Sequence, residues 1–315
     1  DDFPETLAEF TDKFGSNEAC REYLIQQRWP DGFKCPRCGH DKATHLKKYD
    51  RWTCRKCLHQ TTLIAETALR GTHKALKTWF LGMYLVTTSK GGISALELKR
   101  QLGLGSYQTA WAWLKKLRAA MVDPARKPLE GEVEVDESYV GGKEKGVKGR
   151  LTKKKAIVAC AVENTEKGFG RIRLQVVADV TQATLEAFVN DHVKGGATTI
   201  TDGWKGYNSL GKVGFNHIQT VISKSETSAS QVLPGVHRVF SLLKRWLLGT
   251  HQGVVSIKHL QSYLDEFTFR FNRRKSHSFT HAFQRLAEGA VRSAAKPYWR
   301  LIGRIAPEIP LKAAA

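Results

Sequence analysis

The pattern of hydrophobic and polar residues changes near residue 125 of the 315-residue chain. Before this point, hydrophobic residues recur three or four positions apart, which is the spacing of amphipathic helices. Beyond it, runs rich in valine, isoleucine and threonine predict strands, with helices between and after them. The expected helices are 1–28, 73–86, 93–102, 106–121, 181–193, one from about 236, and one that carries Leu260, Leu264, Phe267 and Phe271 on one face. The expected strands are 132–140, 155–163, 171–180, 198–203 and 217–223. This order predicts a mixed α/β sheet with helices packed against it.

Residues 93–121 read as a helix, a turn that contains glycine, and a second helix. Ser94 and Glu97 form a capping-box pattern at the first start, and Ser106 is placed to cap the second helix. The hydrophobic residues of the second helix share one face, so the opposite face is expected to carry its polar side chains: Gln108, Lys115, Lys116 and Arg118. The pattern predicts a helix-turn-helix that contacts DNA, although such helix pairs also occur as parts of plain bundles.

Four of the six cysteines form two pairs with the spacing C-x2-C-x15-C-x2-C: Cys35, Cys38, Cys54 and Cys57. Two such pairs, joined by a hairpin, give the four thiolates of a tetrahedral zinc site. Disulfides are the alternative, and they are disfavoured inside a cell. Because four cysteines complete the metal shell, His40 and His59 are expected to be bystanders, and Cys20 and Cys160 to be ordinary buried thiols.

The charge balance narrows the choice of partner. Fifty lysines and arginines against thirty acidic residues give a formal net charge of +20, which is typical of a nucleic-acid binder; a merely soluble basic protein is the alternative. A basic, glycine-containing segment at 143–155 includes Lys153, Lys154 and Lys155 as candidate phosphate contacts. No apolar run approaches the roughly 20 residues that span a bilayer, and no signal peptide is visible, so we expect an intracellular location.

Three acidic residues alternate along the first expected strand of the second half, Glu132, Glu134 and Asp136, and Asp202 ends the strand 198–203. If the two strands are neighbours, the carboxylates of Asp136 and Asp202 meet, and they repel unless a cation lies between them. Carboxylate oxygens suit Mg²⁺ or Mn²⁺. In a protein that binds nucleic acid, this arrangement predicts two-metal phosphoryl transfer.

Four motifs, "VDESYVGGK", "TDGWKGY", "HRVFSLLKRWLLGTH" and "YLDEFTFRFNRR", carry a family resemblance. From about residue 15 to 290 the chain resembles DDE-type bacterial insertion-sequence transposases, of the family numbered fifteen ninety-five. Members of this family have a zinc ribbon and an ISXO-two-like catalytic domain. The resemblance implies an RNase H-like core, with Asp136 and Asp202 as the first two acids of the catalytic triad.

The third acid is where this chain departs from the family pattern. Relatives have glutamate seven positions before a lysine, and counting back seven positions from Lys244 gives His237. The resemblance therefore implies an Asp-Asp-His triad with Lys244, and neighbouring Arg245, as phosphate contacts. Neutral imidazole is a good ligand for Mn²⁺ and a poorer one for Mg²⁺. Glu134 and Glu226 are two remote candidates for a substitute carboxylate, and a decayed enzyme is the alternative.

The resemblance implies a bacterial, cytoplasmic and nucleoid-associated enzyme that binds the terminal inverted repeats of an insertion sequence. It would cleave at their ends and join the 3′-hydroxyl to target DNA, as a homodimer or larger assembly. The competing functions are a non-catalytic DNA-binding protein and a metal-dependent nuclease without strand transfer. The expected domains are a helical leader (1–28), a zinc ribbon (29–62), a helix-turn-helix region (63–125), the RNase H-like core (126–290) and a C-terminal tail (291–315).

Overall fold

The computed structural model describes residues 3–141, 155–220, 229–253, 256–276, 280–296 and 298–302. The chain forms two compact units, one of Asp1–Val122 with His277–Ala315 and one of Asp123–Ser276. Within the described ranges, no helix has both the length and the apolar character needed to cross a membrane.

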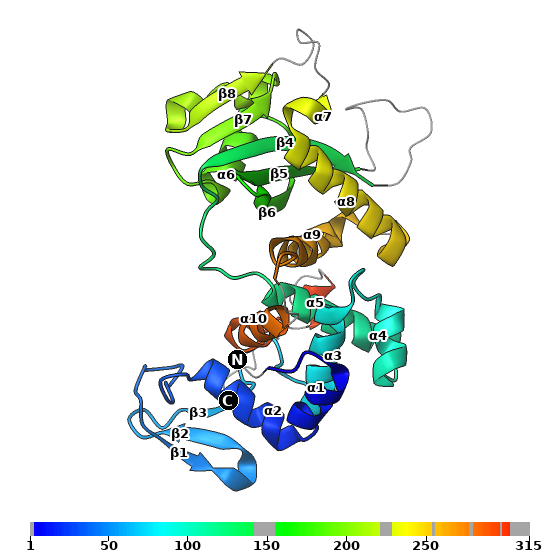
Figure 1. Cartoon of the computed structure of the whole chain (residues 1–315). Coiled ribbons are helices and arrows are strands. Elements are labelled where there is room, and N and C mark those ends of the chain that lie inside the picture. The colour runs from blue at the N-terminus through cyan, green and yellow to red at the C-terminus, as the bar shows by residue number, and fades with distance from the viewer. Residues whose placement is uncertain are drawn as a thin grey trace, which may run out of the picture. The chain divides into compact units, whose positions relative to one another are not determined.

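The first unit combines helices with a small antiparallel sheet (Figure 1). Its helices are α1 (Leu7–Phe14), α2 (Asn17–Arg28), α3 (Leu76–Thr88), α4 (Ala95–Leu102), α5 (Tyr107–Ala120), α10 (Thr280–Arg292) and α11 (Tyr298–Leu301). Its strands are β1 (Ala43–Leu46), β2 (Arg51–Cys54) and β3 (Gln60–Thr62). The expected leader is thus two helices, which begin after the N-caps Thr6 and Ser16 because each hydroxyl accepts a backbone N–H of the first turn.

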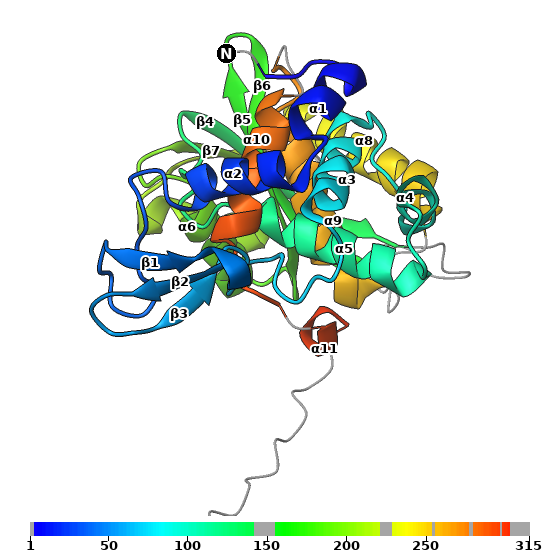
Figure 2. The ribbon, with the colours of Figure 1, turned by 90° about the horizontal axis from the view of Figure 1, so that it is seen from below.

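Helix α10 packs in the first unit, beside α2, α3 and α5 (Figure 2). Phe283 of α10 joins an aromatic cluster with Phe10, Phe14 and Phe80. In most pairs of these four rings, the centroids lie within 6 Å of each other. Gly289 leaves no room for a Cβ against the Ala120 carbonyl, so glycine permits the close approach of α10 to α5. The expected catalytic domain ended at residue 290, but the second unit ends at Ser276 because the apolar face of α10 is buried in the first unit.

The second unit is built on a five-stranded sheet with the order β6-β5-β4-β7-β8. The strands are β4 (Glu132–Val140), β5 (Ala156–Thr165), β6 (Gly168–Val177), β7 (Thr198–Asp202) and β8 (Asn216–Thr220). The pairs β4–β5 and β5–β6 are antiparallel, whereas β4–β7 and β7–β8 are parallel. This is the mixed sheet of an RNase H-like fold, and the expectation from the sequence is confirmed.

Helices cover both faces of this sheet (Figure 1). They are α6 (Gln182–His192), α7 (Ala229–Val232), α8 (Pro234–His251) and α9 (Ile257–Asn272). Val133 and Val135 of β4 point to the face where Leu185 and Phe188 of α6 are buried. Because side chains alternate along a strand, Glu134 and Asp136 point to the other face, where α8 and α9 pack.

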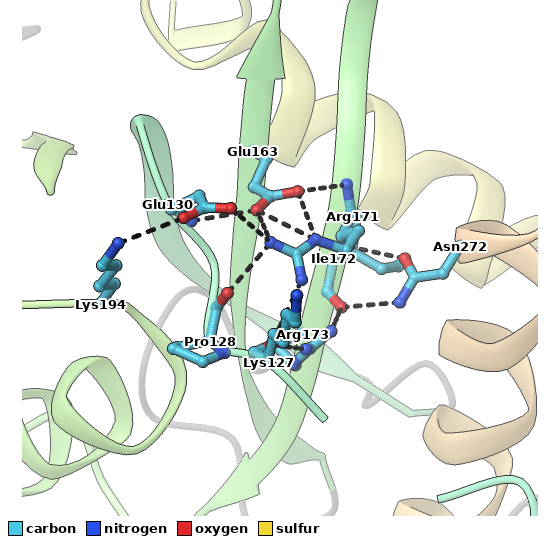
Figure 3. A network of polar contacts seen from close by, with 9 residues as sticks. All are labelled: Lys127, Pro128, Glu130, Glu163, Arg171, Ile172, Arg173, Lys194 and Asn272. Carbon is cyan, nitrogen blue, oxygen red and sulfur yellow. Dashed lines mark hydrogen bonds and ion pairs between the residues drawn. The ribbon is translucent and has the colours of Figure 1, made fainter. Parts of the chain in front are cut away.

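A buried carboxylate ties the segment before β4 to the antiparallel half of the sheet (Figure 3). Glu163 accepts hydrogen bonds from the backbone N–H of Glu130 at 3.0 Å and of Arg171 at 2.9 Å, and its Oε1 lies 2.5 Å from the Arg171 guanidinium. Burial raises the pKa of Glu163, but the hydrogen bonds from Arg171 outweigh it and lower the pKa overall. Asn272 at the end of α9 accepts a hydrogen bond from the Ile172 N–H, which anchors this helix to β6.

Candidate functional site

The four paired cysteines come together in the first unit, on the ribbon formed by β1, β2 and β3. Each pair lies in a tight knuckle, in which the N–H of Gly39 donates to the Cys35 carbonyl and that of Leu58 to the Cys54 carbonyl. Gly39 and Leu58 both have positive φ angles, 72° and 56°, so the second knuckle places a leucine where the first has the more permissive glycine.

The cysteine geometry fits a tetrahedral zinc ion. All four sulfur atoms lie within 4.8 Å of one another, and the Sγ atoms of Cys35 and Cys57 are 3.6 Å apart. The Sγ atoms of Cys38 and Cys54 are 3.7 Å apart. Zn–S bonds of about 2.3 Å in a tetrahedron separate the sulfurs by about 3.8 Å. The same distances are far too long for disulfides, and neither His40 nor His59 belongs to the cluster.

The helix-turn-helix has the expected helices, α4 and α5, but not the expected polar face. Ser94 caps α4 by accepting the Glu97 N–H at 3.1 Å, whereas the Glu97 carboxylate binds Arg100 and Gln101 rather than closing the capping box. Ser106 caps α5 in the same way.

Two of the three cations expected to face DNA on α5 are buried, and that expectation is wrong for them. Lys115 is 7% exposed and Arg118 is 1% exposed, because α4 packs against α5 on one side and α10 on another. Lys116 is half-buried, and its ammonium donates to the Arg70 carbonyl at 2.9 Å. The exposed side chains of α5 lie at its start, at Tyr107 and Gln108.

The parallel pairing of β4 with β7 brings the two aspartates to neighbouring positions. The register pairs Glu134 with Ile200 and Val135 with Thr201, so the next position on each strand is Asp136 and Asp202. Residues at matched positions of adjacent strands point to the same face of a sheet. Oδ1 of Asp136 accepts the Glu137 N–H at 2.8 Å, and Oδ1 of Asp202 accepts the Trp204 N–H at 3.0 Å.

A fully buried tyrosine lies beneath these two strand positions. The Tyr207 hydroxyl donates to Oε2 of Glu137 at 2.8 Å. Burial raises the pKa of Tyr207 well above its usual value, and the carboxylates of Glu137, Asp136 and Asp202 raise it further. The negative charges of both aspartates therefore raise the pKa of the same buried hydroxyl. Tyr207 and Glu137 belong to the motifs "TDGWKGY" and "VDESYVGGK", but the sequence alone did not indicate that they form a pair.

Glu134 does not face solvent; it holds the start of α8. Its side chain is buried, with 2% of the residue exposed, and its Oε2 accepts the Val236 N–H at 2.9 Å. Asn164 donates to the other carboxylate oxygen at 3.1 Å. A carboxylate at the first turn of a helix is stabilised by the unpaired N–H groups and by the helix dipole. Gly235 is required here because a Cβ would lie 3.0 Å from the same oxygen.

Helix α8 places Lys244 over the strand that carries Asp136. The Lys244 ammonium donates to the Ser138 hydroxyl at 2.8 Å, two positions after Asp136 on the same face. Partial burial lowers the pKa of Lys244, and the neighbouring charge of Lys155 lowers it further. Two cations therefore gather at this end of β4, and Arg245 is exposed on the next position of the helix.

His237 lies on α8 directly after Val236 and is half-buried. Within the described ranges, the four cysteines are the one group of three or more potential ligands drawn together closely enough to hold a metal ion. Asp136 and Asp202 share the face of the sheet on which α8, the helix of His237, packs, but these three residues do not form such a group. Lys153, Lys154 and Glu226 lie outside the described residues.

Family models match both units of the chain. The transposase zinc-ribbon domain of IS1595 matches residues 15–60, and the ISXO2-like transposase domain of IS1595 matches residues 128–272. The chain is also similar to an uncharacterized protein in transposable element ISH50 of Halobacterium salinarum. The two are 26% identical over 275 residues, which cover 82% of this chain and 91% of that protein.

Solved structures of Mos1 complexes are distantly similar. The crystal structure of the Mos1 strand transfer complex has 12% identity and a TM-score of 0.31, over 66% of this chain and 75% of that chain. A pre-cleavage Mos1 transpososome has 11% identity and a TM-score of 0.30, over 67% of this chain and 78% of that chain. TM-scores of this size support no structural argument, so the description of the fold rests on the strand order given above.

Proposed function

Because the chain belongs to the IS1595 transposases, with their zinc-ribbon and ISXO2-like domains, we propose that it cleaves insertion-sequence ends and joins them to target DNA. The observation that carries this proposal is the register that sets Asp136 beside Asp202. Helix α8 supports it, because this helix brings Lys244 to the same face of the sheet.

Asp136 and Asp202 are the residues we assign to hold Mg²⁺ or Mn²⁺, with His237 as the third ligand. Their hard oxygen donors suit these ions, and each aspartate is oriented by a backbone N–H on its Oδ1. Bound divalent cations would supply activation of the attacking oxygen and stabilisation of the leaving oxygen. Since His237 brings no negative charge, we expect weaker binding of the metal than in a three-carboxylate site, and a preference for Mn²⁺.

Lys244 is the residue we assign to the DNA phosphate next to the cleaved bond. Its ammonium donates a hydrogen bond to the Ser138 hydroxyl, and it is close enough to Lys155 for the charge of that residue to lower its pKa. A phosphate is the natural counter-ion for such a pair. Arg245, on the exposed side of the same helical turn, is the second phosphate contact on α8.

The first unit is the part we assign to the terminal inverted repeats. The zinc ribbon is rich in lysine and arginine, and the start of α5 exposes Tyr107 and Gln108. In a helix-turn-helix, the N-terminal residues of the second helix contact base edges. Pairing of two transposon ends requires a homodimer or a larger assembly.

A strand-transfer assay with pre-cleaved transposon ends and Mn²⁺ tests this function. We expect joined product with the wild-type chain and none with Asp136→Ala. Glu132→Gln is the matched control, because Glu132 is an exposed acid of the same strand and should keep full activity.

The same assay separates two other functions. The substitution of imidazole for a carboxylate at position 237 favours, as the second candidate, a DNA-binding protein that has lost catalysis. Binding of the ends without any chemistry would support that candidate. Hydrolysis of the ends without joining would instead indicate a nuclease.

A further inference from the structure

A cavity of about 920 Å³ lies in the first unit, beside the start of α5. Its walls come from the segment before α3, from α3 and α5 themselves, and from the chain that follows α10. The volume falls in the range of small-molecule binding sites, and it is larger than a single phosphate group needs.

The described residues at the rim of the cavity carry positive charge. Arg70, Lys74, Lys116 and Lys296 line it, together with His73, and none of the described lining residues is an aspartate or glutamate. Arg70, Lys74 and Lys296 are exposed, and Lys116 is half-buried. In the part of the chain that the structure describes, none of these four is in an ion pair with a carboxylate. The rim therefore attracts an anion.

The floor of the cavity is apolar. The rings of Trp79 and Trp113 are stacked, with centroids 3.6 Å apart and an interplanar angle of 13°. Ala112 and Leu301 extend this surface, and Tyr298, which is 51% exposed, stands at the wall formed by α11. An apolar floor beneath a cationic rim suits a ligand that has both a flat ring and a negative charge.

The walls are held in place by hydrogen bonds that do not involve any ligand. The Ala68 N–H donates to the Ala290 carbonyl at 3.1 Å, and the Ala295 N–H donates to the Glu66 carbonyl at 3.0 Å. The indole N–H of Trp79 donates to the Thr72 hydroxyl at 2.6 Å. The cavity is thus formed before a ligand enters, which lowers the entropic cost of binding.

We propose that this cavity takes an unpaired nucleotide of bound DNA, with the base against the apolar floor and Tyr298 and the phosphates at the cationic rim. The choice of DNA rests on the proposed function. Gln108 and Thr109, at the start of α5, also line the cavity, so it adjoins the part of a helix-turn-helix that meets a DNA groove. A paired base is stacked within the duplex and cannot reach the floor, whereas duplex phosphates alone would leave the floor empty.

Binding of two probes by the full chain tests the proposal. The probes are a short oligothymidylate and a duplex of the same length, each followed by fluorescence anisotropy over a salt series. For the double variant Lys74→Ala with Lys296→Ala, we plot the logarithm of the single-strand binding constant against the logarithm of the salt concentration. The slope of this plot should be less steep than that of the wild-type chain by about 1.4. Lys90→Ala is the matched control, because Lys90 is an exposed lysine of the same unit that does not line the cavity.

Tyr298 supplies the second variant. Tyr298→Ala should weaken oligothymidylate binding roughly tenfold through loss of base stacking, while Tyr298→Phe retains it. Duplex binding should be the same for Tyr298→Ala and Tyr298→Phe. Equal losses of duplex and single-strand binding in the lysine variant would overturn the proposal, as would wild-type oligothymidylate binding by Tyr298→Ala. Failure of the wild-type chain to join transposon ends would instead count against the proposed function, since oligothymidylate binding is measured independently.

Discussion

The buried carboxylate of Glu134 accepts a hydrogen bond from the backbone N–H of Val236 at 2.9 Å, across 102 positions of the chain. At the other end of the same contact surface, Lys244 donates to Ser138. Eight residues of helix rise about 12 Å, and four residues of strand span about 13 Å. The spacing of the two contacts along the helix therefore matches their spacing along the strand, and together they hold α8 along the strand that carries Asp136.

Replacement of Glu134 by alanine should destabilise the second unit. The change leaves the Val236 N–H buried without an acceptor, which costs about 1–3 kcal/mol of the free energy of unfolding. Urea unfolding measures the loss. Glu132→Ala removes an exposed acid of the same strand, and it should change stability by less than about 0.5 kcal/mol. Equal stability of the two variants would show that the Glu134 contact does not hold α8.

Removal of one ribbon cysteine should abolish zinc binding. Cys54 contributes one of the four sulfur atoms of the cluster, and three thiolates hold the ion much more weakly than four. Metal analysis of the purified chain should find one zinc ion per wild-type chain and none for Cys54→Ala. Cys20→Ala, which removes a buried thiol outside the cluster, should retain the ion. A zinc content that does not differ between these variants would argue against the ribbon site.

Acid should weaken the second unit through His192. Burial, together with the charges of Arg126 and Arg173, lowers the pKa of His192 from 6.5 to about 4. Between these pH values the unfolded chain binds a proton that the folded chain does not, so stability falls as the pH falls. We expect a loss of roughly 1–2 kcal/mol at pH 5 relative to pH 7 from this group.

The variant His192→Gln isolates that contribution, because glutamine does not titrate. Its unfolding free energy should fall less than that of the wild-type chain between pH 6.5 and 4 in urea titrations. If both chains show the same pH dependence, His192 is not the group responsible.

Replacement of His237 by glutamate should change the metal preference of strand transfer. A carboxylate restores the third negative charge and is a better ligand for Mg²⁺ than imidazole is. Joining by His237→Glu should therefore persist in Mn²⁺ and increase about tenfold or more in Mg²⁺ relative to the wild-type chain. Complete loss of joining in both metals would mean that the imidazole has a role other than ligation.

The local patterns of the sequence predicted most elements of the fold. Alternation in 132–140 placed Glu134 and Asp136 on one face, and cysteine spacing predicted the cluster that the structure contains. The partner of Glu134 was not predictable in this way. It is a backbone N–H of a helix that follows much later in the chain, and no side-chain pattern marks it.

On the polar face of α5, the local pattern of the sequence gave a wrong prediction. Helical spacing correctly identified its apolar side, but Lys115 and Arg118 are buried because other helices also cover the side expected to face DNA. One of those helices, α10, comes from residues 280–292, and its docking on α5 depends on contacts such as the one at Gly289. A pattern within 106–121 contains no information about a helix so distant in sequence.

A crystal of the full chain soaked in Mn²⁺ tests whether Asp136 and Asp202 bind divalent cations together. We expect anomalous peaks within about 2.2 Å of a carboxylate oxygen from each aspartate, with His237 turned toward them, and no peak in Asp136→Asn crystals. Mn²⁺ bound elsewhere, with these two carboxylates unligated and pointing apart, would contradict it.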